Sequence, residues 1–270
     1  MISPGTFPIS GGKSSSIEML MQKMANLFQK EADVFMFGKR FRKQPEFEMK
    51  GSITYYRYTS SKGKSYIDQS IEQLQVIKPD IIHIENRPRF AKAVRLSMPN
   101  AKIVLALQST LFMSRQHISK EALVTCLESA DAIIVNSHFL KNHMIKETLC
   151  SASKISVNHL GVDTDQFQPK WHHEQKERAE LLKEEWGVTH RKILIYSGRL
   201  IEIKGVHHIL EAMPELIKVD PSIILFIAGT SLSPTSENLA YEARLRNLAE
   251  KVKGHVIFAS FITHNEIHTW

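Results

Sequence analysis

The chain has 270 residues, 43% of them hydrophobic, and a formal net charge of +7. This length suffices for one large domain or two small ones with buried cores. No apolar run approaches the roughly 18–20 residues of a bilayer-spanning helix, and the first residues do not form a basic segment followed by an apolar core. The only cysteines, Cys126 and Cys150, fit reduced thiols. We therefore expect a soluble, cytoplasmic globular protein.

In the first half of the chain, short apolar runs typical of strands alternate with segments that have the helical period of apolar residues. Residues 1–4 leave almost no room for a first strand, and a loop over residues 5–12 precedes a helix over residues 17–30 with serine N-caps. Short apolar runs predict strands at residues 34–37, 53–58, 81–84, 103–107, 132–135 and 155–157. Helical periods lie between them, at residues 67–77, 90–97, 120–129 and 139–148. This alternation predicts a parallel α/β sheet with right-handed crossovers.

The alternation pauses around residues 161–169, and a polar helix over residues 172–186 follows. We therefore predict one domain over residues 1–170 and a second over residues 171–270. In the second, strands are expected at residues 193–196, 223–228 and 256–258, with helices at residues 206–219 and 237–252. A doubly wound sheet usually has five or six strands. We thus expect an incomplete second domain, a chain truncated at its C-terminus, and lower stability in residues 190–270.

The stretch from Ile193 to Gly205 contains the strongest candidate site. A buried strand breaks at Ser197 and Gly198, a loop carries Arg199 and Lys204, and Gly205 opens a helix. Strand ends followed by helix N-termini hold phosphate groups well, and two cations suit a diphosphate. The alternative interpretation is a surface loop whose cations are solvated. The pair Gly11 and Gly12, just before the first helix, is a second potential anion cradle.

Eight cations lie between Gly38 and Lys64, against Glu46 and Glu48 alone. They are Lys39, Arg40, Arg42, Lys43, Lys50, Arg57, Lys62 and Lys64. Such a patch can attract an anionic membrane surface or a polyanionic acceptor, or it can be a solvated loop face. No recognition helix or aromatic-studded sheet accompanies the charge, so we do not expect nucleic-acid binding.

Two further strand ends carry polar residues. Glu85, Asn86 and Arg87 follow one strand, and ligands bind at the carboxyl ends of parallel strands, so these residues are acceptor-side candidates. Ser137 follows another strand and either faces a ligand or caps the next helix.

These motifs resemble those of a known enzyme family. Gly198-Arg199-Leu200 with Lys204-Gly205 is similar to the donor-binding signature of family 4 glycosyltransferases. Gly161-Val162-Asp163 with Phe167 and Pro169 resembles that family's inter-domain signature, and Gly11-Gly12 its N-terminal glycine loop. The segment from His83 to Pro88 resembles the spore-coat-associated branch of bacilli.

The resemblance implies the GT-B fold, with two Rossmann-like domains facing across a cleft. It implies a nucleoside-diphosphate sugar (NDP-sugar) donor on the second domain, an acceptor on the first, and retention of anomeric configuration. No metal cofactor is expected, so Arg199 and Lys204 would stabilise the leaving diphosphate. Gly11, Gly12, Gly198 and Gly205 would complete the donor contacts.

The sequence departs from the family pattern at three points. Gln108 stands where many members have a His, and an amide cannot serve as a titrating acid or base, so we assign it a catalytic position with an altered role. Leu160 replaces an Asn before the inter-domain glycine. The family's pair of donor-binding glutamates would lie beyond Trp270.

We therefore predict a retaining, hexosyltransferase-type glycosyltransferase acting on a cell-envelope or spore-coat acceptor. Two alternatives remain open at this point. One is a truncated, non-catalytic protein that binds sugar nucleotides or partners. The other is a sugar-nucleotide epimerase of the same fold.

Overall fold

A computed structural model describes most of the chain. The described residues are 1–10, 14–41, 44–59, 63–169, 171–231, 235–259, 262 and 266–270. The chain divides into two compact units, Met1–Gly161 and Val162–Trp270. The division lies earlier in the chain than the predicted boundary between residues 170 and 171. None of the described helices is both long and apolar enough to span a bilayer.

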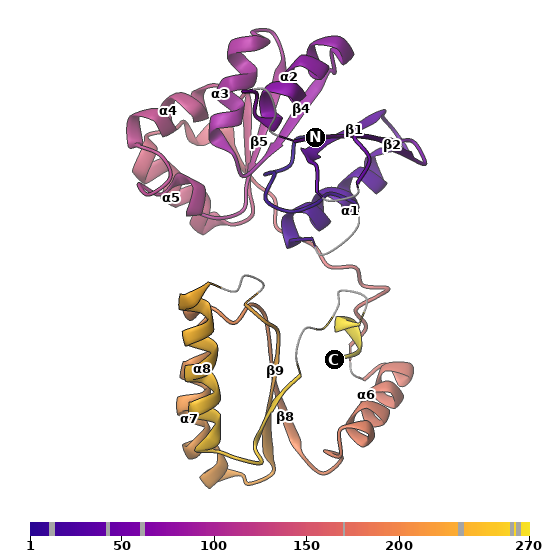
Figure 1. Cartoon of the computed structure of the whole chain (residues 1–270), viewed down its shortest axis with the longest axis vertical. Coiled ribbons are helices and arrows are strands. Elements are labelled where there is room, and N and C mark those ends of the chain that lie inside the picture. The colour runs from indigo at the N-terminus through magenta and orange to yellow at the C-terminus, as the bar shows by residue number, and fades with distance from the viewer. Residues whose placement is uncertain are drawn as a thin grey trace. The chain divides into compact units, whose positions relative to one another are not determined.

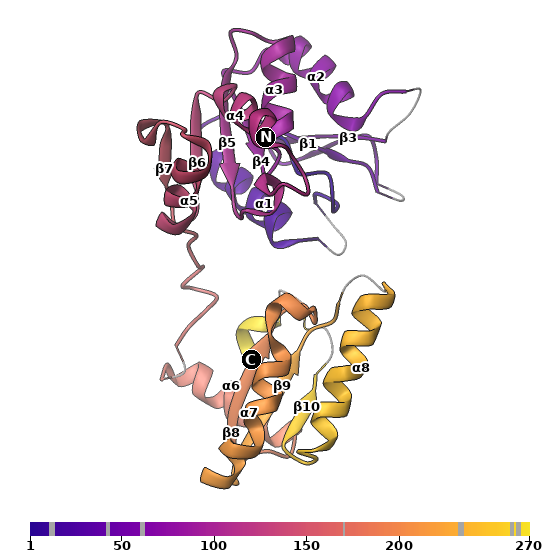
Figure 2. The same ribbon diagram turned by 90° about the vertical axis from the view of Figure 1, so that its left-hand side faces the viewer.

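The first unit has a sheet with helices on both faces (Figures 1 and 2). Its strands are β1 (Val34–Lys39), β2 (Phe47–Lys50), β3 (Ile53–Tyr58), β4 (Ile81–Glu85), β5 (Lys102–Leu107), β6 (Ala132–Val135) and β7 (Ile155–Val157). They form two groups, β1-β3-β2 and β4-β5-β6-β7, in which all pairs but β2–β3 are parallel. The predicted parallel α/β architecture is confirmed.

Two features of this sheet differ from the sequence prediction. Ile2 bridges in parallel to Phe37 of β1 and to Ile84 of β4, so a single residue joins the two strand groups. Its side chain is fully buried. The opening residues are indeed too short for a full strand, as expected. The sequence analysis did not predict that Ile2 would lie between β1 and β4. Strand β2 was not predicted; it forms an antiparallel hairpin with β3 through Gly51, whose φ is +60°.

Four of the five helices described in the first unit begin at a side-chain cap, and the third begins instead with Pro88 in its first turn. The five are α1 (Ser16–Phe28), α2 (Tyr66–Ile77), α3 (Pro88–Ser97), α4 (Lys120–Glu128) and α5 (His138–Thr148). Short 3-10 turns η1 (Leu111–Met113) and η2 (Ala152–Lys154) lie in the connections. Ser15, Ser65, Ser119 and Ser137 accept hydrogen bonds from first-turn amides of α1, α2, α4 and α5. Each such cap satisfies an amide that the helix itself leaves free.

The second unit has a three-stranded parallel sheet in the order β10-β9-β8. The strands are β8 (Lys192–Ser197), β9 (Ile223–Ala228) and β10 (Val256–Phe258). Helices α7 (Val206–Val219) and α8 (Ser236–Glu250) cover one face, and α6 (His173–Glu185) lies on the other (Figure 1). The short turns are η3 (Glu202–Lys204) and η4 (Ile267–Thr269).

Candidate active site

The predicted phosphate loop lies at the carboxyl end of β8. The amide of Gly198 donates to the Ala228 carbonyl at 3.0 Å, so the loop leaves the sheet beside the end of β9. Leu200 is buried and donates to the Thr230 carbonyl at 3.2 Å. The Tyr196 hydroxyl donates to the Arg199 carbonyl at 2.9 Å. Between these anchors, Arg199 is held by its backbone while its side chain is exposed.

Gly229, which sequence reasoning missed, makes this loop possible. Its φ is +150°, and a Cβ at this position would lie 1.8 Å from the Gly198 carbonyl oxygen. No real side chain tolerates that distance, so the ends of β8 and β9 can approach only through glycine. The available signal was the glycine directly after the apolar run of β9.

Lys204 ends the turn η3, which a charged group from α8 holds in place. Arg244 contacts Glu202 at 3.1 Å and Glu211 of α7 at 3.2 Å, tying the turn to the helix that follows it. The Lys204 side chain is exposed, and neither it nor Arg199 forms an ion pair within the part of the chain that the structure describes. Both cations are therefore available to an anion.

The first turn of α7 is anchored by a buried pair. The Tyr241 hydroxyl lies 2.9 Å from His207 Nδ1 and accepts the His207 amide at 3.3 Å. Both side chains are buried. Since Gly205 adopts the left-handed conformation (φ +69°) immediately before Val206, the helix N-terminus is fixed directly behind Lys204. Because the His207 amide donates to Tyr241 and the His208 amide to the Gly205 carbonyl, this N-terminus would favour an anion mainly through the helix dipole.

The first unit brings polar groups together at the carboxyl ends of β4 and β5. The Glu85 carboxylate is buried, accepts from His83 Nε2 at 2.9 Å, and lies 3.4 Å from Gln108 Nε2. The structure thus joins Glu85 and Gln108, which the sequence analysis placed in separate roles. The buried Oε1 of Gln108 finds no hydrogen-bond partner among the described residues.

The backbone of Gln108 is clamped from both neighbouring strands. Its amide donates to Asn86 Oδ1 at 2.8 Å, and its carbonyl accepts from Asn136 Nδ2 at 2.9 Å. Asn86 adopts a left-handed φ of +53°, which turns its side chain toward β5. Asn136 was not predicted as a site residue. Its position at the end of β6, beside Ser137, was the available signal.

Arg87 is held by Thr6, which lies in the segment before α1, and by an aromatic ring. Its Nη2 donates to Thr6 Oγ1 at 2.8 Å, and its guanidinium lies 3.7 Å from the centre of the Phe112 ring. Burial lowers the pKa of Arg87, but an arginine remains charged at neutral pH. Glu18 of α1 lies within electrostatic reach, and its buried Oε1 is without a hydrogen-bond partner among the residues described.

Three other predicted site residues have different outcomes. Ser137 accepts from the Leu140 amide at 3.2 Å, which is the helix-capping alternative. Contact with an acceptor stays a prediction. Gly11 and Gly12 lie outside the described residues.

Four of the described cations in the basic stretch from residue 38 to 64 form ion pairs, two of them with the same carboxylate. Arg40 pairs with Glu46, Lys50 and Arg57 with Glu48, and Lys64 with Glu72. The inclusion of Arg57 in a surface patch was wrong, because its side chain is fully buried and also donates to backbone carbonyls of Ile9 and Pro45. Arg42, Lys43 and Lys62 fall outside the described residues.

No group of three or more His, Cys, Asp or Glu side chains that could hold a metal ion occurs within the described residues. The candidate site residues described above are cations, amides and a buried carboxylate.

Family models match both parts of the chain. The model for glycosyltransferase family 4 matches residues 11–166, and that for glycosyl transferases group 1 matches residues 178–270. The chain belongs to glycosyltransferase family 4. The second match includes the loop with Arg199 and Lys204, and the first includes Glu85 and Gln108.

Two relatives from Bacillus subtilis (strain 168) extend over nearly the whole chain. Spore coat protein SA is 24% identical over 267 residues, which are 99% of this chain and 70% of that protein. The putative glycosyltransferase YtcC is 26% identical over 96% of this chain and 63% of its own length. These matches confirm the predicted likeness to glycosyltransferases of bacilli.

A solved structure shows the same fold. Alr3699/HepE from Anabaena, in complex with UDP, aligns with a TM-score of 0.71 at 17% sequence identity. The alignment covers 99% of this chain and 70% of that protein. The architecture of two α/β units with parallel sheets is thus GT-B-like, as predicted.

Proposed function

We propose that this glycosyltransferase moves a sugar from an NDP-sugar to a cell-envelope or spore-coat acceptor with retention of anomeric configuration. The observation that carries the proposal is the loop after β8. It presents Arg199 and Lys204, both exposed and free of ion pairs within the described residues, beside the anchored N-terminus of α7. The UDP bound by the Anabaena protein of like fold supports a nucleotide donor.

The reaction requires stabilisation of a departing diphosphate. As the glycosidic bond to the donor breaks, negative charge develops on the diphosphate, and fixed cations stabilise that charge more in the transition state than in the ground state. We assign this role to Arg199 and Lys204, with Gly198, Gly205, Gly11 and Gly12 allowing close backbone approach. No metal is needed in this scheme, since the two cations supply the positive charge.

The acceptor side is assigned to the carboxyl ends of β4 and β5. Arg87, Asn86 and Glu85 lie there with Gln108, whose free Oε1 can accept a hydrogen bond from a sugar hydroxyl. The name of spore coat protein SA supports a coat acceptor, and we place the enzyme in the cytoplasm, where sugar nucleotides are made. We also propose peripheral contact of residues 38–64 with an anionic membrane, through the cations that remain after four of the described ones pair with carboxylates.

The test is UDP binding by calorimetry, followed by transfer assays with a panel of NDP-sugars. Arg199→Ala and Lys204→Ala should each weaken UDP binding by about tenfold or more, since a charge-assisted bond to phosphate contributes about 1.5–3 kcal/mol. Arg178→Ala and Lys176→Ala on α6 remove matched exposed cations and should leave UDP affinity unchanged.

Unchanged UDP affinity in both loop variants would refute the donor assignment. Nucleotide binding without transfer to any acceptor, or with epimerisation of the sugar, would refute transferase activity while keeping the donor site. Gln108→His should accelerate transfer if this position corresponds to the family histidine.

A further inference from the structure

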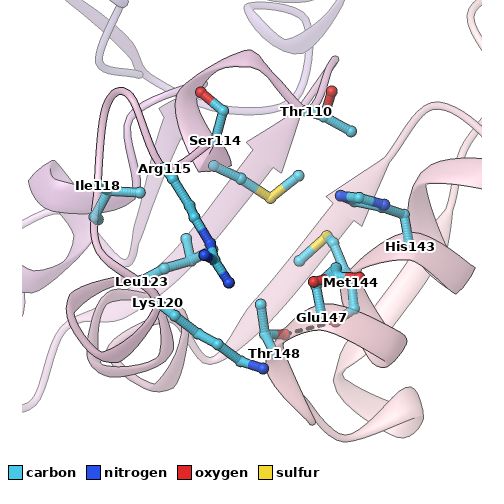
Figure 3. Close-up of a pocket in the computed structure, with 11 residues that line it drawn as sticks. Thr110, Ser114, Arg115, Ile118, Lys120, Leu123, His143, Met144, Glu147 and Thr148 are labelled. Carbon is cyan, nitrogen blue, oxygen red and sulfur yellow. Dashed lines mark hydrogen bonds between the residues drawn. The ribbon is translucent and has the colours of Figure 1, made fainter.

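A cavity of about 260 Å³ lies in the first unit, and its lining begins at Thr110, two residues after Gln108 (Figure 3). It is bounded by the segment that follows β5, by the start of α4 and by the second half of α5. None of its lining residues has a role in the proposed transfer reaction.

The floor of the cavity is apolar. Met113, Leu123 and Met144 line it, and at most 8% of each side chain is exposed. Methionine side chains are flexible and polarisable, so a floor with two of them adapts its shape to a hydrocarbon group. The floor therefore suits an apolar ligand segment.

The wall carries two cations. Figure 3 shows Arg115 and Lys120 extending across the cavity from one side, with Glu147 and His143 on the other. Neither cation forms an ion pair with a carboxylate of the described residues, although Glu121 lies within electrostatic reach. With His143 neutral, the lining has one net positive charge, which matches a single anionic group.

Apolar side chains continue from the cavity onto the surface. Leu111, in the same turn as Met113, is 50% exposed. Phe139 is 73% exposed and stacks on His143 with ring centroids 6.1 Å apart. Exposed large apolar residues beside a cationic hollow form an amphipathic surface, which is typical of a site for apolar ligands with charged heads.

We propose that this cavity binds a single-chain amphiphile with a phosphate-type head group. The hydrocarbon chain packs on Met113, Leu123 and Met144, and the head lies between Arg115 and Lys120. Two exposed cations bind free phosphate weakly in water, because solvent and salt screen them. Burial of the hydrocarbon chain supplies the remaining affinity, and this free energy is proportional to the apolar area removed from water. The site does not depend on the transferase activity.

The first experiment titrates decyl phosphate, below its micelle concentration, into the protein labelled with ¹³C at the methionine methyl groups. We expect the Met113 and Met144 signals, assigned through Met→Leu variants, to shift in a saturable manner. Arg115→Ala combined with Lys120→Ala should weaken the affinity by about tenfold or more, while the thermal unfolding midpoint stays near that of the wild type.

The matched control is Lys176→Ala combined with Arg178→Ala, which removes the same charges from α6 in the other unit. It should leave decyl phosphate binding unchanged. Equal loss in both double variants would overturn the site, because it would show a response to net charge alone. Absence of shifts at Met113 and Met144 would overturn it as well.

Two further experiments test whether both the head group and the hydrocarbon chain are needed, and whether the ligand comes from a bilayer. Inorganic phosphate and decyl maltoside should each bind much more weakly than decyl phosphate, and equal affinity for either one would contradict the two-part site. Sedimentation with phosphatidylglycerol vesicles, lost in the Arg115 and Lys120 double variant, would identify a bilayer lipid as the source. Decyl phosphate binding without vesicle binding would identify a dispersed amphiphile.

Discussion

The loop that carries Arg199 depends on Gly229, the residue directly after the next strand. Gly229 has a backbone conformation that side chains rarely adopt, and it touches the Gly198 carbonyl. A side chain here meets both a conformational penalty and a backbone clash that no rotamer relieves. The position of Arg199 therefore depends on a residue 30 positions later in the chain, Gly229, that has no Cβ.

Gly229→Ala should destabilise the second unit by about 3 kcal/mol or more, because backbone must move apart at the ends of β8 and β9. Gly254→Ala is the control: its φ is +83°, but a Cβ there would meet nothing within 4 Å. The control should cost only about 1 kcal/mol of backbone strain. Urea unfolding of both variants measures the difference, and equal costs would show that the contact with Gly198 relaxes freely.

At the scale of elements, Asp131 joins three of them. It accepts from the Ile103 amide in β5 at 2.7 Å and pairs with Arg95 of α3 at 2.7 Å, directly before β6. Burial raises the pKa of Asp131, but the Ile103 hydrogen bond and the Arg95 ion pair outweigh it, and the pKa lies below its usual value. The ionised form is therefore favoured in the folded state.

This shift predicts a loss of stability in acid. The contribution of Asp131 is present above the pKa of an unfolded aspartate, about 4, and disappears as the pH falls through the lower folded value. Asp131→Asn should therefore reduce stability at neutral pH and flatten its dependence on pH below about 4. Thermal unfolding from pH 2 to 7 measures both. A parallel pH dependence in variant and wild type would show that Asp131 is not responsible.

At the scale of the molecule, the two units differ in how well their apolar residues are covered. The sheet of the first unit packs in an extended core reaching from Ile2 to Ile155. In the second unit β8 is an edge strand, and Ile193, Leu194 and Ile195 are each more than a third exposed. An edge strand with exposed apolar side chains gains little from burial and leaves backbone groups unpaired on one side.

We therefore expect limited proteolysis to cut the second unit first, within residues 190–270. A time course with a non-specific protease, read by mass spectrometry, checks this. The tight turn at Gly51 in the first unit serves as an internal reference for exposed loops. Equal resistance of the two units would show that the exposed face of β8 does not limit local stability.

The sequence by itself determined the type and order of nearly all described elements. Several strands, such as β3, β6 and β9, have the predicted bounds. The apolar residues of such a strand lie within one short stretch of sequence, so the strand can be recognised without knowing its neighbours. The loop after β8 was predictable because a strand, a glycine turn and a helix start are neighbours in the chain, but the expected burial of Ile193, Leu194 and Ile195 was wrong. Strand β2 was missed because its alternation is short and half charged.

Only the tertiary structure decided what distant residues do for one another. Ile2 joins the two strand groups, Arg57 is buried rather than part of a surface patch, and Asn136 holds the Gln108 backbone. A local pattern fixes which face of an element is apolar, but not which element packs against it. Contacts such as Gly229 on Gly198 arise only when parallel strands align side by side, so their roles were decided by the fold.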